Sequence, residues 1–145
     1  MDITSFDANI YCKFQANQYK CGKTVQFSYY YDTEKNTCQP FDYGYCLHPY
    51  NVYPTLHACT DDCRDMNHYR TQSNLTANIF CRLQPEFGSC NSYHPRFYYD
   101  MVEMTCKGFS YSGCGGNQNR FDQATLCMDT CMDFVKPCSE KECFH

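Results

Sequence analysis

The sequence contains no Trp, and no apolar run approaches the roughly 20 residues that a membrane-spanning helix needs. Basic residues are also few and scattered: 12 Lys and Arg against 16 Asp and Glu give a formal net charge of -4. That balance argues against a protein that follows the phosphates of nucleic acid. The N-terminal stretch MDITSFDANIY lacks the basic start and apolar centre of a signal peptide, so we expect a mature chain with Met1 added for expression.

Cysteine, by contrast, is abundant. Fourteen of the 145 residues are Cys, which is typical of secreted scaffolds held together by disulfides, so we expect an extracellular location. The 14 Tyr and 11 Phe supply the large apolar surfaces that Trp does not.

Twelve of the cysteines form two series with nearly the same spacing. The gaps are 8, 16, 7, 12 and 3 residues in the first series and 8, 15, 7, 12 and 3 in the second. The first series is Cys12, Cys21, Cys38, Cys46, Cys59 and Cys63, and the second is Cys81, Cys90, Cys106, Cys114, Cys127 and Cys131. The chain therefore holds two copies of one module of about 50 residues, a size that needs covalent support. Spacing alone leaves 15 pairings open in each copy.

Each copy has the same predicted elements. Aromatic strands are expected over 27–32 and 96–101, and return strands over 39–43 and 107–111, with turns at 33–36 and 102–104. Short helices are expected within 54–63 and 121–131, with Thr55 and Asp122 as caps. The last two cysteines of each copy are four residues apart, so one helix face presents both and can be joined to two other segments.

The residues between and after the copies are mostly polar. We expect a linker over 65–79, with Asn74 in the sequon Asn74-Leu75-Thr76 either glycosylated or an unmodified loop residue. In the tail, 135–145, Cys138 and Cys143 have only each other left and are expected to close a local loop. Two thiols and His145 are too few ligands for a structural zinc site, so no metal and no cofactor is expected.

Both copies resemble the Kunitz, or pancreatic trypsin inhibitor, domain. In the second copy the resemblance is carried by FCRLQPEFGSC (80–90), RFYYD (96–100), FSYSGCGGNQNRF (109–121) and CMDTC (127–131). The predicted domains are 11–64, which is divergent, and 80–134. The tandem arrangement and the CGGN stretch resemble the salivary Kunitz proteins of ticks.

The resemblance implies a small disulfide-rich α+β fold in which each module is a twisted antiparallel hairpin with a short C-terminal helix and three disulfides. The implied pairs are Cys12–Cys63, Cys21–Cys46, Cys38–Cys59, Cys81–Cys131, Cys90–Cys114 and Cys106–Cys127.

The resemblance also implies that a rigid, substrate-like loop in each module meets a serine protease. The loop residues are Lys20, Cys21, Gly22, Lys23 and Thr24 in the first module, and Ser89, Cys90, Asn91, Ser92 and Tyr93 in the second. The residue after the tethering cysteine enters the specificity pocket of the protease, and trypsin-like pockets have an Asp that requires Lys or Arg there.

Neither loop meets that requirement simply. Asn91 is uncharged, and it is either a weak specificity residue or a solvated loop residue. Ser112 stands where the family usually has Gly, which is expected to disturb the neighbouring loop because Ser tolerates fewer backbone angles. In the first loop, Gly22 holds the specificity position by count. The gap between Cys21 and Cys38 is one residue longer than its counterpart in the second copy. If this extra residue makes the loop bulge at Gly22, Lys23 takes the specificity position; otherwise Lys23 lies in solvent.

The favoured function is a secreted serine-protease inhibitor, from the saliva of a blood feeder, that acts on host haemostasis as an anticoagulant. Part of its binding would use an exosite on the target. The acidic pairs Asp61-Asp62 and Glu140/Glu142 either meet such a basic exosite or are ordinary solvated surface charges. The alternative is a non-inhibitory binding protein for a host receptor, channel or haemostatic or inflammatory protein. No nucleophile–base constellation is evident, so we expect no enzyme. We expect a monomer that binds no nucleic acid.

Overall fold

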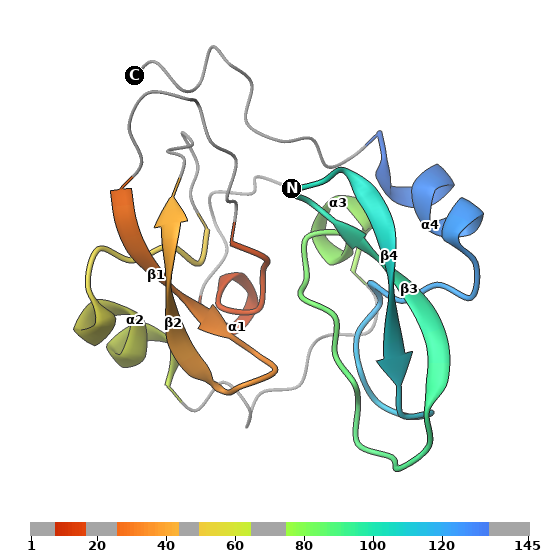
Figure 1. The fold of residues 1–145 in the computed structure, drawn as a ribbon, viewed down its shortest axis with the longest axis horizontal. Coiled ribbons are helices and arrows are strands. Elements are labelled where there is room, and N and C mark those ends of the chain that lie inside the picture. Colours follow the sequence, from red (N-terminus) through yellow and green to blue (C-terminus); the bar gives the residue numbers. More distant parts are fainter. Residues whose placement is uncertain (1–7, 17–25, 44–49, 65–74, 134–145) are drawn as a thin grey trace. The chain divides into compact units, whose positions relative to one another are not determined.

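The computed structural model describes residues 8–16, 26–43, 50–64 and 75–133, which divide into two compact units with the same order of elements (Figure 1). The first unit contains α1 (Ala8–Tyr11), β1 (Gln26–Asp32), β2 (Thr37–Tyr43) and α2 (Leu56–Cys63). The second contains α3 (Ala77–Phe80), β3 (His94–Asp100), β4 (Thr105–Tyr111) and α4 (Ala124–Cys131). The prediction of two hairpin-plus-helix modules is therefore confirmed.

Each unit is built on an antiparallel two-stranded hairpin, β1–β2 and β3–β4. The two registers are equivalent, because Tyr31 lies opposite Cys38 and Tyr99 lies opposite Cys106. Both turns begin with an aspartate whose Oδ1 accepts hydrogen bonds from the backbone N–H groups two and three residues further on. Such Asp side chains stabilise turns by this local bonding. The predicted turns and strands are confirmed, although each return strand begins two residues earlier than predicted and Met101 lies in the turn.

A buried asparagine ties three segments together in each unit. The Oδ1 atom of Asn51 accepts a hydrogen bond from the Tyr31 N–H at 2.7 Å, and its Nδ2 donates to the carbonyls of Cys12, Phe14 and Tyr31. Asn119 makes the equivalent bonds to Tyr99, Cys81 and Leu83 in the second unit. Both side chains are almost completely buried, which is tolerable because every polar atom is paired.

The C-terminal helices are shorter than the predicted segments and start differently. Thr55 caps α2 as predicted, since its Oγ1 accepts a hydrogen bond from the Ala58 N–H at 3.1 Å. The prediction that Asp122 caps α4 is wrong: Gln123 is the N-cap residue and makes no side-chain cap bond. The Asp122 carboxylate instead pairs with the Arg96 guanidinium at 3.1 Å, so it is turned toward β3.

Disulfides join each helix to two other segments, as its paired cysteines predict. Cys59 of α2 bonds to Cys38 on the hairpin, and Cys63 bonds to Cys12. The second unit contains Cys81–Cys131, Cys90–Cys114 and Cys106–Cys127. These five bridges coincide with pairs implied by the family resemblance. The pairs Cys21–Cys46 and Cys138–Cys143, like Asn74 and most of the linker, lie outside the described residues.

Within the described ranges, no helix has the length and apolar character required to cross a membrane.

Candidate functional site

The loop before β3 carries the second set of predicted partner-binding residues. Ser89, Cys90, Asn91, Ser92 and Tyr93 are all exposed, and Tyr93 is 78% exposed. The Cys90–Cys114 disulfide ties this loop to the loop that follows β4, with the two Cα atoms 5.4 Å apart. The structure therefore presents these five side chains to solvent on a covalently anchored support. Its exposed Asn91 is compatible with both sequence-based interpretations of that residue.

Backbone hydrogen bonds hold this loop against the loop that follows β4. The Ser89 N–H donates to the Cys114 carbonyl at 3.1 Å, and the Ser92 N–H donates to the Ser112 carbonyl at 3.1 Å. The Ser112 N–H in turn donates to the Phe87 carbonyl at 2.7 Å. Three bonds over six residues hold the loop backbone in place, so a partner would not have to order it on binding.

Ser112 does not disturb this arrangement, contrary to the expectation from the sequence. The described non-glycine residues with positive φ are Asn36, Asn51 and Met104, so Ser112 does not need the backbone freedom of Gly. Its side chain is completely buried. The Ser112 Oγ accepts a hydrogen bond from the Cys90 N–H at 3.0 Å and donates one to the Cys114 carbonyl at 3.1 Å. The serine is accommodated because both loops supply partners for its hydroxyl.

Gly88 permits the close approach of the two loops. Its φ of +94° lies in the region that L side chains rarely adopt. A Cβ atom added there would lie 2.2 Å from the Cys114 carbonyl oxygen and 2.6 Å from the Ser112 Oγ. The glycine two residues before the tethering Cys90 is thus required by both conformation and space.

Two side chains that were not predicted to be important, Tyr111 and Arg120, hold the glycine-rich CGGN loop in place. The Arg120 guanidinium lies 4.0 Å from the centre of the Tyr111 ring, a cation–π contact. The Tyr111 hydroxyl and the Arg120 Nη1 both donate to the Gly115 carbonyl at 2.9 Å. The signal available in the sequence was the motif CGGN-x-NRF itself, which contains Arg120.

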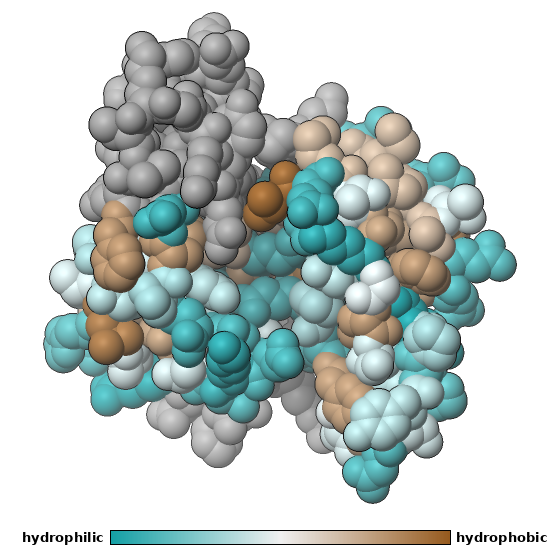
Figure 2. All heavy atoms as spheres, viewed as in Figure 1, coloured by the Kyte–Doolittle hydropathy of each residue, from teal (hydrophilic) through white to brown (hydrophobic). Residues whose placement is uncertain are grey.

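Two aromatic rings lie beside the loop. Phe87 and Tyr93 are 40% and 78% exposed, and their ring centres are 5.5 Å apart. At the lower end of the second unit, Figure 2 shows a brown, hydrophobic group beside pale and teal, more hydrophilic ones. Exposed aromatic residues with few rotatable bonds are favoured at protein-binding surfaces. Phe87 was not among the predicted site residues, because the predicted loop begins two residues later, at Ser89.

The first loop, Lys20 to Thr24, lies outside the described residues, as do Glu140 and Glu142. The other acidic pair is partly engaged within the chain. Asp61 lies 3.9 Å from Arg64, with both side chains more than half exposed. Asp62 accepts hydrogen bonds from the hydroxyls of Tyr11 and Tyr53, which leaves less of its charge for a partner.

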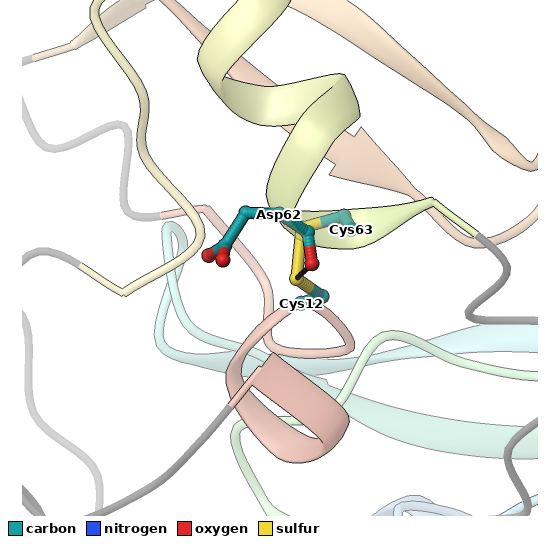
Figure 3. A group of neighbouring side chains, drawn as sticks. All are labelled: Cys12, Asp62 and Cys63. Atoms are coloured by element: carbon teal, nitrogen blue, oxygen red, sulfur yellow. Dashed lines mark hydrogen bonds between the residues drawn. A yellow bond between two sulfur atoms is a disulfide. The ribbon is translucent and has the colours of Figure 1, made fainter.

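The sulfur atoms of Cys12 and Cys63 and a carboxylate oxygen of Asp62 lie within 4.8 Å of one another (Figure 3). This group does not fit a metal, because the two sulfurs form a disulfide and thiolates are the metal-binding form of cysteine. Figure 3 shows the Asp62 carboxylate directed away from the disulfide. Burial and the hydrogen bond to Asp62 raise the pKa of Tyr53, so the group is a structural contact between α1, α2 and the Tyr53 segment.

Comparison with known proteins matches both units to one family model, the Kunitz/bovine pancreatic trypsin inhibitor domain, over residues 11–64 and 80–132. Actinia tenebrosa protease inhibitors are 38% identical over 133 residues, which is 90% of this chain and 46% of that protein. Doenitin-1 of Haemaphysalis doenitzi is 31% identical over 85% of this chain and 86% of that protein. Tissue factor pathway inhibitor of Rattus norvegicus is 30% identical over 86% of this chain and 42% of that protein.

Proposed function

Because this chain belongs to the Kunitz/bovine pancreatic trypsin inhibitor family of non-enzymatic protease inhibitors, we propose that it is a secreted, monomeric inhibitor that presents residues 89–93 to a serine protease. The observation that carries this proposal is the anchored loop itself. Its five side chains are exposed, while the Cys90–Cys114 disulfide and the hydrogen bonds to Ser112 and Cys114 hold its backbone. A protease that binds such a loop loses little free energy to ordering it.

The neutral side chain of Asn91 determines which proteases the loop suits. A pocket with an Asp at its base would leave that carboxylate unpaired against Asn91, at a cost of about 3–5 kcal/mol by analogy with broken buried ion pairs. That cost corresponds to at least about a hundredfold in affinity. We therefore assign Asn91 to a pocket that accepts a small uncharged polar group, and not to a trypsin-like pocket.

The Phe87–Tyr93 pair supplies the apolar contact that Asn91 lacks. A few aromatic residues commonly dominate the binding energy of an interface. With 78% of its side chain exposed, Tyr93 has the larger area to bury against the protease surface next to the specificity pocket. Tyr93→Ala should therefore weaken inhibition at least about tenfold, whereas Ser110→Ala on the exposed part of β4 should not.

The test is a panel of trypsin-, chymotrypsin- and elastase-like proteases and coagulation factors, measured with the full chain and with Asn91→Lys. The expected result is inhibition of a protease with a neutral pocket, and a gain of trypsin inhibition on Asn91→Lys of at least about a hundredfold. If the full chain slows no protease at micromolar concentration and leaves a clotting assay unchanged, the inhibitor proposal fails.

We assign the target to haemostasis, with part of the contact outside the pocket. The support is similarity to a protein whose name places its action on the tissue factor pathway. In the first unit Lys23 remains the candidate for a basic specificity residue, and loss of trypsin-like inhibition on Lys23→Ala would establish that role. Tandem modules on one linker can engage two sites and thereby raise avidity.

The second candidate function is a non-inhibitory binding protein for a host receptor or haemostatic protein. The observation in its favour is that both positions after the tethering cysteine, Gly22 and Asn91, are uncharged. The net charge of the chain, -4, counts against one form of this function, a channel blocker that depends on basic residues. A chain that inhibits no protease yet prolongs clotting would favour this second function.

A further inference from the structure

Ser112 contacts the protease-binding loop on both sides of Asn91. Its Oγ accepts a hydrogen bond from the Cys90 N–H at 3.0 Å, one residue before Asn91. Its carbonyl oxygen accepts one from the Ser92 N–H at 3.1 Å, one residue after Asn91. A single buried residue therefore holds the backbone N–H groups of both neighbours of the specificity residue, Cys90 and Ser92.

The hydroxyl of Ser112 also links the two partners of the exposed disulfide. It accepts from Cys90 and donates to the Cys114 carbonyl at 3.1 Å, so both of its hydrogen-bonding functions are used. The side chain is 0% exposed, although Cys90 itself is exposed. A hydroxyl buried with two correctly oriented partners stiffens the groups that it joins.

We propose that Ser112 is a positioning residue of the inhibitory loop, whose hydroxyl holds Cys90 and whose carbonyl holds Ser92 so that Asn91 keeps one presentation. This inference rests on the proposed inhibitory function for its biological consequence, but the bracing itself is a property of the free chain.

The bracing has a consequence for cleavage of the loop. Hydrolysis of the Asn91–Ser92 bond adds one water molecule across it, placing the hydroxyl oxygen on the Asn91 carbonyl carbon and a hydrogen on the Ser92 nitrogen. With Cys90 held by Oγ and the Ser92 nitrogen held by the carbonyl oxygen, the two new ends stay close together. Removal of water between them restores the peptide bond, so net cleavage is slow while Ser112 holds both ends.

The experiment compares Ser112→Ala with Ser110→Ala in the full chain by amide hydrogen exchange. Ser110 lies two residues away on β4 and is exposed, so it controls for loss of a serine hydroxyl. Ser112→Ala should accelerate exchange of the Cys90 N–H by about tenfold, the factor expected for one lost buried hydrogen bond. Exchange of the Tyr99 N–H, held by Asn119, should not change, which separates local loosening from global unfolding.

Ser112→Gly also removes the hydroxyl and provides a second test in case Ser112→Ala does not fold. An unchanged Cys90 exchange rate in both variants would overturn the proposal. With a protease that the unaltered chain inhibits, Ser112→Ala should also raise the rate of Asn91–Ser92 hydrolysis in the complex by about tenfold, and Ser110→Ala should not. If the exchange result is positive but no protease is inhibited, the bracing stands and the proposed function fails.

Discussion

Met104 ends the β3–β4 turn with a φ of 56°, in the left-handed region that ordinary side chains disfavour. The equivalent residue of the β1–β2 turn is Asn36, with a φ of 52°. Asn tolerates this conformation better than Met, and Met104 is 43% exposed, so its side chain contributes little to the core. We therefore expect Met104→Asn to stabilise the second unit by about 0.5–1 kcal/mol.

Urea denaturation measures this difference directly. Val102→Asn is the matched control, because Val102 is exposed in the same turn but is not among the described residues with positive φ. A gain in the free energy of unfolding for both variants would show that replacing an exposed apolar side chain, and not the backbone angle at position 104, determines the effect.

At the scale of elements, α1, α2 and the segment around Tyr53 are held together by hydrogen bonds from two tyrosine hydroxyls to one carboxylate. Tyr11 and Tyr53 both donate to Asp62, and burial followed by the Asp62 hydrogen bond raises the pKa of Tyr53. Above about pH 10 an unfolded tyrosine loses its proton while Tyr53 retains it, so the unfolded state binds fewer protons. The stabilisation is therefore complete below about pH 10 and declines as the pH rises further.

Tyr53→Phe should lower the free energy of unfolding near neutral pH and make it less dependent on pH above about pH 10. Unfolding by urea at several pH values from about 8 to 11.5 measures this slope. Tyr93→Phe is the control, since the Tyr93 side chain is 78% exposed. If the free energy of unfolding of Tyr53→Phe falls with pH as steeply as that of the unaltered chain, Tyr53 is not responsible for the loss of stability at high pH.

Elements with a local signal were predictable from the sequence, and those defined by distant contacts were not. The aromatic strands, the turn residues and the paired helical cysteines all act over a few residues, and each was found. The Asp122 cap was mispredicted because Arg96, distant in sequence, binds that carboxylate. The bridging role of Ser112 was hidden for the same reason: its partners include Cys90, 22 residues earlier.

At the scale of the whole molecule, the repeated sequence has produced two cores with equivalent internal ties. The tie in the first unit joins Asn51 to the Tyr31 backbone, and the tie in the second joins Asn119 to the Tyr99 backbone. Each asparagine bonds only within its own unit in these contacts. The two side chains therefore offer matched sites for asking whether the units unfold separately.

Asn119→Ala removes four hydrogen bonds and leaves the Tyr99 N–H without its buried acceptor, which should destabilise the second unit by about 3 kcal/mol or more. Amide exchange gives equivalent reporters, the Phe121 N–H bonded to Phe97 and the Tyr53 N–H bonded to Tyr29. Exchange at Phe121 should accelerate while exchange at Tyr53 does not.

Asn51→Ala should give the reverse pattern: exchange of the Tyr53 N–H should accelerate, and exchange of the Phe121 N–H should stay unchanged. Each of the five described disulfides and each buried asparagine joins residues of one unit, so we expect damage to one core to leave the other folded. Equal acceleration at both reporters in either variant would mean that the two units unfold as one cooperative body. Separate responses would instead mean that one unit stays folded after the other has unfolded.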